Sequence, residues 1–427
     1  MCIRDSSSTN VLSSKTQTVG DALLNDTVLV GLVTRDTGVA ILSDALLGKR
    51  VLLAISGGIA AVESVRLARE LRRHQADLTV IMSEEATKII TPLAVSWGSD
   101  TIVHQGWASE MSQLDDFDVT LIAPATRNTI SKHVHGIMDS PLMMALSASR
   151  GRKSKLCFVP SMHTDLFDDP VTTELLDALR DEGSHVIINE IEEGKLKQPD
   201  PIFIVAEVCH IANRTQSSKS IAITMGANRA PIDAVRAIQN ASSGRTGWII
   251  AEYLHRMGHN VICIAGKTSA SPSFSLPNVF RDGTPDGMLK LCKEIATESK
   301  PDVWIHAAAV LDYFTEAEHG KKPSGEDNWQ LNLNPGRKHI EELSSLVGDS
   351  IRIGFKLESD VEVDTLVQRA EAQIDRYGVN AVVANLMEEM NDPSKLRARI
   401  VHDDGRIEEI EDDFSLVQAI QGIISPN

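Results

Sequence analysis

A loop rich in hydroxyl groups and glycines, residues 240–247, lies between two apolar segments of different periodicity. Residues 221–225 before it are β-forming and lead into Gly226, whereas apolar residues recur at helical spacing over 248–257. A strand, a polar loop and a helix in this order offer backbone N–H groups and a positive helix end to a phosphate. The residues that we expect to contact the phosphate are Gly226, Ser242, Ser243 and Gly244. An ordinary loop whose serine caps a helix would look similar, because the spacing matches neither a P-loop nor G-x-G-x-x-G.

Three polar loops in the first half of the chain follow predicted strands at residues 50–55, 78–82 and 119–122. Glycines after the first strand permit close backbone approach, and the helix that follows favours an anion. Because the carboxyl ends of parallel strands meet at one sheet edge, these loops predict a second anion site. Its candidate residues are Ser56, Gly57, Gly58, Ile59, Ser83, Ala125, Thr126 and Asn128. A doubly wound sheet places polar loops at this edge in any case, which is the alternative explanation.

The elements that must position these loops alternate between strands and helices in both halves. Further strands are predicted at residues 156–159, 185–188, 261–265, 303–306, 351–355 and 381–384. This alternation predicts an α/β fold with two doubly wound parallel sheets. Near the C-terminus, residues 397–401 and 406–410 have the pattern of a hairpin, followed by a helix over 414–424. We expect an N-terminal extension (1–47), a first domain (48–212), a polar linker (213–220) and a second domain (221–427).

Composition excludes several classes of function. A chain of 427 residues suits two or three domains, and its formal net charge of −17 argues against nucleic-acid binding. No apolar run reaches the length of a membrane helix, and the N-terminal region lacks the apolar core of a signal peptide. The five cysteines are scattered without a C-x-x-C pair, which predicts a reduced, cytoplasmic protein without a zinc site. No other metal site can be recognised.

Four segments of the second half, in order, carry a family resemblance. "APIDAVRAIQNASSGRTG", "AAAVLDY", "GKKPSG" and "LNLNP" resemble the phosphopantothenate–cysteine ligase half of the bifunctional coenzyme A biosynthesis enzymes. In the first half, "APATRNT" and "PSMH" resemble the flavin-dependent phosphopantothenoylcysteine decarboxylase of the same enzymes. The resemblance extends from about Gly48 to the C-terminus. It implies a flavodoxin-like domain that binds FMN, followed by a Rossmann-like ligase domain.

The resemblance assigns roles to residues of the ligase half. The family activates 4′-phosphopantothenate as an acyl nucleotide, using CTP (or ATP) and Mg²⁺, before the amine of L-cysteine attacks. The implied contacts to the intermediate and the nucleotide are Asn240, Arg236, Ala308, Asp312, Lys321, Phe355 and Arg376. Lys322 is the reserve for Lys321, and Arg376 replaces bacterial-type lysines that are absent here. Without the resemblance, Asp312 would suit a structural cap and the lysine pair a solvated surface.

The decarboxylase half departs from the family pattern at three positions. The position of the usual histidine, counted back from Pro124 without gaps, is Glu110, and the nearest histidine is His104. The flap cysteine is missing, with residues 192–197 in its place, and His163 replaces an asparagine, both as in the archaeal form. An ionised glutamate beside the substrate carboxylate would oppose binding. We therefore expect bound FMN but weak turnover.

Other interpretations remain open from the sequence. One is a ligase whose N-terminal domain only binds flavin or supports assembly, and another is a non-enzymatic flavoprotein scaffold. A nicotinamide oxidoreductase is disfavoured, because neither half carries G-x-G-x-x-G. The resemblance also implies a homo-oligomer built from trimers, and a dodecamer in bifunctional members.

Overall fold

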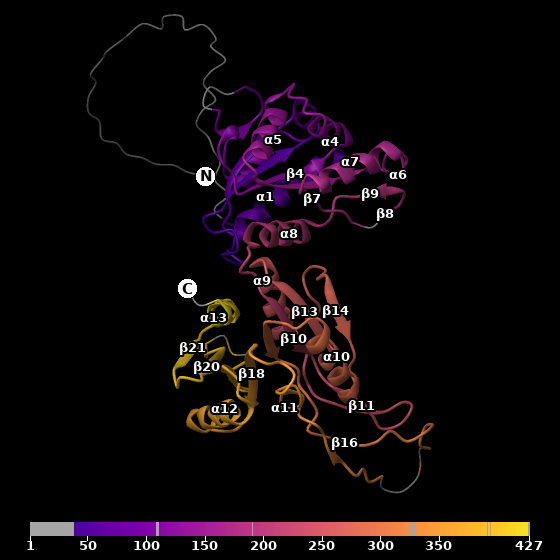
Figure 1. Cartoon of the computed structure of the whole chain (residues 1–427), viewed down its shortest axis with the longest axis vertical. Helices are drawn as coiled ribbons and strands as arrows, with labels where there is room; N and C mark the ends of the chain where they lie inside the picture. The colour runs from indigo at the N-terminus through magenta and orange to yellow at the C-terminus, as the bar shows by residue number, and fades with distance from the viewer. Residues whose placement is uncertain are drawn as a thin grey trace, which may run out of the picture.

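Two separate parallel sheets organise the chain. The computed structural model describes residues 38–427, apart from 108–110, 190, 324, 326–328, 391, 393 and 426–427. The first sheet, in purple and magenta in Figure 1, has the order β3-β2-β1-β4-β5-β7, with all neighbours parallel. Its strands are β1 (Arg50–Ile55), β2 (Asp77–Met82), β3 (Val103–His104), β4 (Val119–Ala125), β5 (Lys155–Pro160) and β7 (His185–Val186).

Helices cover both faces of the first sheet. Alternate residues of β1 enter different cores: Val51 and Leu53 face one side, and Leu52 and Ala54 the other. On the Val51 side lie α1 (Ser64–Arg73), α3 (Pro92–Ser99) and α8 (Pro201–Asn213). On the other side lie α4 (Arg127–Val134), α5 (Pro141–Gly151) and α7 (Pro170–Asp181). With both faces covered, the strands are apolar throughout.

The second sheet has the order β14-β13-β10-β15-β18-β19-β20-β21, parallel up to β19 and antiparallel at its last two strands. Its strands are β10 (Ser220–Met225), β13 (Asn260–Ala265), β14 (Asn278–Arg281), β15 (Val303–His306), β18 (Ile351–Glu358), β19 (Ala381–Leu386), β20 (Ala398–His402) and β21 (Ile407–Ile410). Helices α9 (Arg245–Arg256) and α13 (Asp413–Ile424) cover one face, and α10 (Pro285–Glu298) and α12 (Val363–Tyr377) the other. The predicted fold class is thus confirmed.

Short elements project from these two units. The strands β11 (Arg229–Pro231) and β12 (Ala237–Gln239) form a hairpin, and β16 (Tyr313–Phe314) pairs with β17 (Asn334–Pro335). Figure 1 shows β11 and β16 together at the end of the molecule far from the first sheet. A third small sheet joins β6 (Met162–His163), β8 (Ile191–Glu192) and β9 (Lys195–Leu196). The remaining helical turns are α2 (Glu84–Thr87), α6 (Thr164–Phe167), α11 (His339–Glu342), η1 (Ile59–Glu63) and η2 (Ser112–Leu114).

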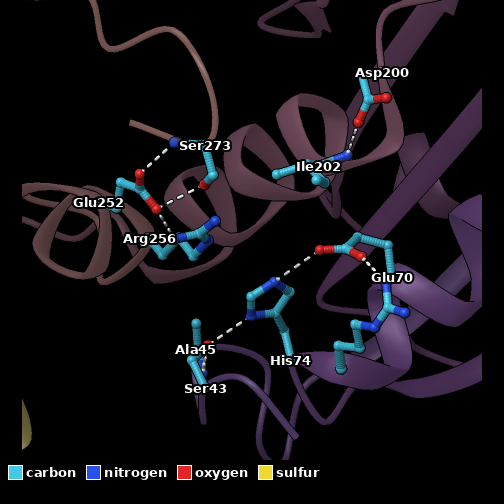
Figure 2. A network of polar contacts seen from close by, with 10 residues as sticks. Ser43, Ala45, Glu70, His74, Asp200, Ile202, Glu252, Arg256 and Ser273 are labelled. Carbon is cyan, nitrogen blue, oxygen red and sulfur yellow. Dashed lines mark hydrogen bonds and ion pairs between the residues drawn. The ribbon is translucent and has the colours of Figure 1, made fainter. Parts of the chain in front are cut away.

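The two units meet where α8 packs against α9. The rings of His210 and His255 stack with their centroids 4.3 Å apart, and the hydroxyl of Tyr253 donates to Asp44 at 3.0 Å. Figure 2 shows the polar side chains at this junction: His74 lies between Ser43 and Glu70 and contacts both, and Arg256 lies nearby on α9.

None of the described helices combines the length and the apolar composition needed to cross a membrane.

Candidate functional site

The phosphate-binding candidates of the second half converge at the carboxyl end of β10. Gly226 and Gly244 both have a positive φ of 78°. A Cβ atom on Gly226 would lie 2.7 Å from the carbonyl oxygen of Lys267, and one on Gly244 would lie 2.5 Å from Cγ2 of Thr268. The same Cβ on Gly244 would lie 3.4 Å from the Cα of Gly226. Only glycine fits this close approach, and Gly244 also stands at the N-terminus of α9.

Asn240 connects the loop of residues 240–247, which we call the glycine loop, to the segment that follows β15. Its side-chain amide donates to the carbonyl oxygens of Ala309 and Val310, at 3.0 and 3.1 Å. The adjacent Ala308 donates its backbone N–H to Thr224 on β10. The structure therefore brings Asn240 and Ala308, which are far apart in the sequence, to one edge of the sheet.

Arg236, in the turn of the projecting β11–β12 hairpin, contacts Lys322 of a loop that is distant in the sequence. The guanidinium of Arg236 is 2.6 Å from Asp233 and also donates to the carbonyl oxygen of Lys322. Asp233, which is buried, further accepts the backbone N–H groups of Val235, Arg236 and Lys322. These N–H groups, together with the charge of Arg236, lower the pKa of Asp233 to about 2. The neighbouring Lys321 is exposed.

Asp233 lies in the quoted "APIDAVR" segment, but nothing in the sequence singles it out. Its role depends on backbone N–H groups from two segments that are distant in the sequence, so only the folded chain reveals it.

Asp312 and Arg376 line one pocket of about 440 Å³. The carboxylate of Asp312 forms an ion pair with Lys338, and Arg376 is 3.5 Å from Glu341. Lys338 and its neighbour Arg337 were missed from the sequence, although both follow the "LNLNP" segment directly. Two adjacent cationic residues close to a family motif are the sequence signal that would have identified them. In the structure, both line a pocket of a size suited to a nucleotide.

Phe355 lies apart from these polar groups, half-buried on β18 and packed against the core of the second sheet. At the end of the next strand, the buried Asn385 accepts a hydrogen bond from Arg397, which also donates to Thr246 in the first turn of α9. The strand ends and the glycine loop are thereby joined by direct polar contacts.

The predicted loops of the first half also meet at one sheet edge. The hydroxyl of Ser56 donates to the carbonyl oxygen of Pro124 at 2.7 Å and accepts the N–H of Thr126 at 2.9 Å. A Cβ on Gly57 would lie 2.2 Å from the Cβ of Glu85, and one on Gly58 would lie 3.4 Å from Thr126. Ser56 is buried and holds two loops together, so its hydroxyl serves the loop structure itself.

Helix caps explain the other hydroxyl groups at this edge. Thr126 accepts the backbone N–H of Thr129 as N-cap of α4, and Ser83 accepts that of Ala86 as N-cap of α2. Ala125 is buried, whereas Asn128 is exposed and Ile59 is 79% exposed. The loops therefore converge, but their side chains differ in how they face solvent.

The acid–base candidates of the first half are less well defined. Glu110 lies outside the described residues. His104, the nearest histidine, has its Nε2 atom 2.9 Å from the hydroxyl of Ser112. His163 is exposed on β6, opposite Lys195 of the segment that replaces the flap cysteine. Among the described residues, no three histidine, cysteine, aspartate or glutamate side chains lie close enough to hold a metal ion.

Two family models match successive parts of the chain. Residues 40–213 match the family model described as Flavoprotein, and residues 216–415 match the model of the DNA/pantothenate metabolism flavoprotein C-terminal domain. The Coenzyme A biosynthesis bifunctional protein CoaBC of Thermococcus kodakarensis is 36% identical over 355 residues, covering 81% of this chain and 87% of that protein. Its counterpart in Bacillus subtilis is 28% identical and covers 79% and 87%, respectively.

Two solved structures are similar to parts of this chain. The DNA/pantothenate metabolism flavoprotein of Streptococcus pneumoniae is 22% identical, with a TM-score of 0.44, and covers 48% of this chain and 98% of that one. The FMN binding protein AtHal3 is 22% identical, with a TM-score of 0.33, and covers 38% and 94%.

Proposed function

The chain belongs to the family of bifunctional coenzyme A biosynthesis proteins, and from this premise we propose which residues carry out each reaction. In the C-terminal half, the enzyme ligates 4′-phosphopantothenate to cysteine through an acyl nucleotide. In the flavoprotein half, it decarboxylates the ligation product to 4′-phosphopantetheine. The assignment of individual residues below is our own.

The close approach of Gly226 and Gly244 is the main observation behind the proposal for the ligase site. A carboxylate does not react with an amine at neutral pH, so it must first be joined to a nucleotide with pyrophosphate as the leaving group. We assign the triphosphate to the backbone of the loop that ends at Gly244, because the positive φ of Gly226 and Gly244 and their close packing against Lys267 and Thr268 fix that backbone at the start of α9. Backbone N–H groups at the start of α9, with Ser242 and Ser243, would donate to the phosphate oxygens.

Asn240 and the loop of residues 318–322, which we call the lysine loop, act on the other reactant in this proposal. The side-chain amide of Asn240 already holds the turn after β15, and its carbonyl oxygen can accept a hydrogen bond from the amide of phosphopantothenate. The exposed ammonium of Lys321 would neutralise charge that develops as the acyl nucleotide forms. Arg236 and Lys322 would hold that loop in place.

CTP, with ATP as the substitute, is our proposed nucleotide, and Asp312 and Arg376 would contact it from the 440 Å³ pocket. We propose that Mg²⁺ arrives on the triphosphate, because it keeps several water ligands and uses substrate phosphates in such sites.

FMN is assigned to the loops around Ser56, Ser83 and Thr126. Gly57 and Gly58 lie where those loops meet, and the absence of a side chain on Gly57 lets its backbone pack against Glu85. We propose that the backbone N–H groups of this turn hold the flavin phosphate. When bound, FMN supplies two-electron chemistry at the substrate thiol. His163 and the segment of residues 192–197 would contribute proton transfer from the adjacent small sheet.

The direct test is to identify the products. Full-length protein reconstituted with FMN would be incubated with 4′-phosphopantothenate, cysteine, Mg²⁺ and either CTP or ATP, and the products identified by mass spectrometry. We expect 4′-phosphopantothenoylcysteine first and 4′-phosphopantetheine after it. The variant Asn240→Ala should lower the ligation rate about 100-fold. Absence of the ligated product with both nucleotides would refute the proposal.

We also propose that the enzyme is a homo-oligomer. Large apolar side chains are exposed on the first unit, including Ile59 (79%), Leu93 (67%) and Trp107 (58%). Contact with other copies would cover them. Light scattering on the purified protein would measure the mass of the assembly, and a monomeric mass at all concentrations would contradict the proposal.

A further inference from the structure

Trp329 contacts two cationic side chains, Arg236 of the projecting hairpin and Lys322 of the lysine loop. The guanidinium carbon of Arg236 is 5.1 Å from the centroid of its ring, and the ammonium of Lys322 is 4.9 Å from it. Both distances are within the range of cation–π attraction. Trp329 is half-buried, so part of this attraction is shielded from water. A single aromatic ring thus bridges the β11–β12 turn and the lysine loop.

Four further contacts hold the lysine loop against the same turn. The carboxylate of Asp233 accepts the backbone N–H of Lys322 at 3.2 Å, and Arg236 donates to the carbonyl oxygen of the same lysine at 3.3 Å. The N–H of Ala234 donates to the carbonyl oxygen of Gly320, and that of Glu318 to Ile232. The backbone of Lys322 and its ammonium are therefore both engaged.

Lys321 differs from Lys322 in this respect. Its side chain is exposed, yet its neighbours on either side, Gly320 and Lys322, are hydrogen-bonded to the hairpin. The contacts of Lys322 consequently set which of the two adjacent lysines projects from the loop.

We propose that Trp329 is a positioning residue for the ligase reaction: it clamps Lys322 and Arg236, and thereby presents Lys321 to the acyl nucleotide. This inference rests on the proposed role of Lys321 and adds to it the residue that selects the lysine. The ring itself does not touch the reacting atoms. Without it, the loop would lose both cation–π contacts and would spend less time in the productive position.

The inference is tested by the variants Trp329→Ala and Trp329→Phe. Trp97→Ala is the matched control, because Trp97 also carries a cation–π contact, to Arg69, but lies in the first unit. In the ligase assay we expect Trp329→Ala to lower kcat about tenfold with little change in KM for cysteine. Trp329→Phe should recover most of the loss, since a smaller ring still attracts cations, and Trp97→Ala should match the wild type.

Limited digestion with trypsin supplies a readout that needs no activity. Trypsin cuts poorly before proline, so the Lys322–Pro323 bond resists it, and cleavage in this pair falls between Lys321 and Lys322. The N–H of that bond is held by Asp233. Cleavage there should be about tenfold faster in Trp329→Ala than in the wild type, because it follows the population of the open loop.

The two assays separate the inference from the proposed function. A wild type that releases no pyrophosphate would refute the ligase assignment, while the digestion would still decide whether Trp329 holds the loop. Equal cleavage rates in Trp329→Ala and the wild type would overturn the inference, as would an unchanged kcat in an active enzyme. A kcat loss that Trp329→Phe fails to recover would also overturn it.

Discussion

At the scale of single residues, the adjacent lysines show how environment separates two identical side chains. Lys322 is held through its backbone N–H, its carbonyl oxygen and its ammonium, whereas Lys321 is exposed. A flexible, solvated ammonium costs little to reposition when a ligand arrives. The structure therefore favours Lys321 as the mobile cation and Lys322 as the anchor of the loop.

Lys321→Ala should lower the rate of acyl-nucleotide formation about 100-fold or more, because one preorganised charge donor contributes on the order of 3 kcal/mol. The free energy of unfolding should change little, since the side chain is exposed. Rapid-quench measurement of pyrophosphate checks the rate, and urea unfolding checks the stability. If Lys322→Ala strongly lowered the rate of acyl-nucleotide formation and Lys321→Ala left it normal, the roles of the two lysines would be exchanged.

Glu110 permits a gain-of-function prediction in the decarboxylase half. An ionised glutamate beside the substrate carboxylate would repel it and would supply no imidazole for proton transfer. General acid–base groups contribute about 10²- to 10⁴-fold, so we expect Glu110→His to raise the rate of carbon dioxide release. Bound FMN, measured by its visible absorbance, should be unchanged. No gain in rate with full flavin occupancy would exclude a catalytic defect at this position.

His306, at the end of β15, makes the stability of the second unit depend on pH. Burial, and then the positive charge of Arg352, lower its pKa to about 3. The unfolded chain, with an ordinary pKa of about 6.5, therefore binds more protons than the fold between these values, so stability falls as pH falls below 6.5. We expect His306 to lower the free energy of unfolding by about 2 kcal/mol when the pH falls from 7 to 5.

Urea unfolding of the wild type and of His306→Gln at both pH values checks this prediction. The variant should lose less stability on acidification than the wild type. Identical losses would show that His306 does not titrate on unfolding.

At the scale of elements, the strand–loop–helix unit from β10 to α9 depends on Gly244. Its φ of 78° strains any other residue, and a Cβ there would meet Thr268 at 2.5 Å. Gly244→Ala should therefore cost about 1–3 kcal/mol of stability and weaken nucleotide binding. Gly348→Ala is the control, because Gly348 also has a positive φ but has no atom within 4 Å of the added Cβ.

Calorimetric titration with CTP and thermal unfolding would measure both effects of Gly244→Ala. A variant that binds CTP as tightly as the Gly348→Ala control would show that the glycine loop does not hold the nucleotide.

The long elements were accessible from the sequence for a physical reason. A strand buried on both faces must be apolar throughout, so β1, β4, β10 and β19 are readable as continuous apolar runs. The two-residue strand β3 was not predicted, because so short a run carries no periodicity. The same limit applies to the small sheet of β6, β8 and β9, whose pairing is set by tertiary contacts.

The candidate site was predictable only in part. Motifs of fixed order single out the glycine loop, Asn240 and the lysine pair as candidates in the sequence. The partners of these residues were not found: Asp233 gathers N–H groups from two loops, Lys338 pairs with Asp312, and Trp329 bridges Arg236 and Lys322. Each of these contacts depends on where two separate loops meet, which local sequence does not encode.

At the scale of the whole molecule, the chain joins two enzymes of consecutive reactions through a packed junction. The product of the ligase half is the substrate of the decarboxylase half. Helices α8 and α9 pack together, and His255 lies 3.0 Å from Glu207 across the junction. Figure 1 shows β11 and β16 at the end of the molecule far from the first sheet. With the two sites as we propose them, the intermediate would leave the ligase site to reach the flavin site of the same chain.

The release of pyrophosphate by the full-length protein tests the central claim most directly. With 4′-phosphopantothenate, CTP or ATP, and Mg²⁺ but no cysteine, we predict a burst of pyrophosphate close to one equivalent per ligase site. Addition of cysteine should convert the burst into continuous release, because its amine then removes the acyl group. Release of inorganic phosphate in place of pyrophosphate, or no release with either nucleotide, would contradict the account.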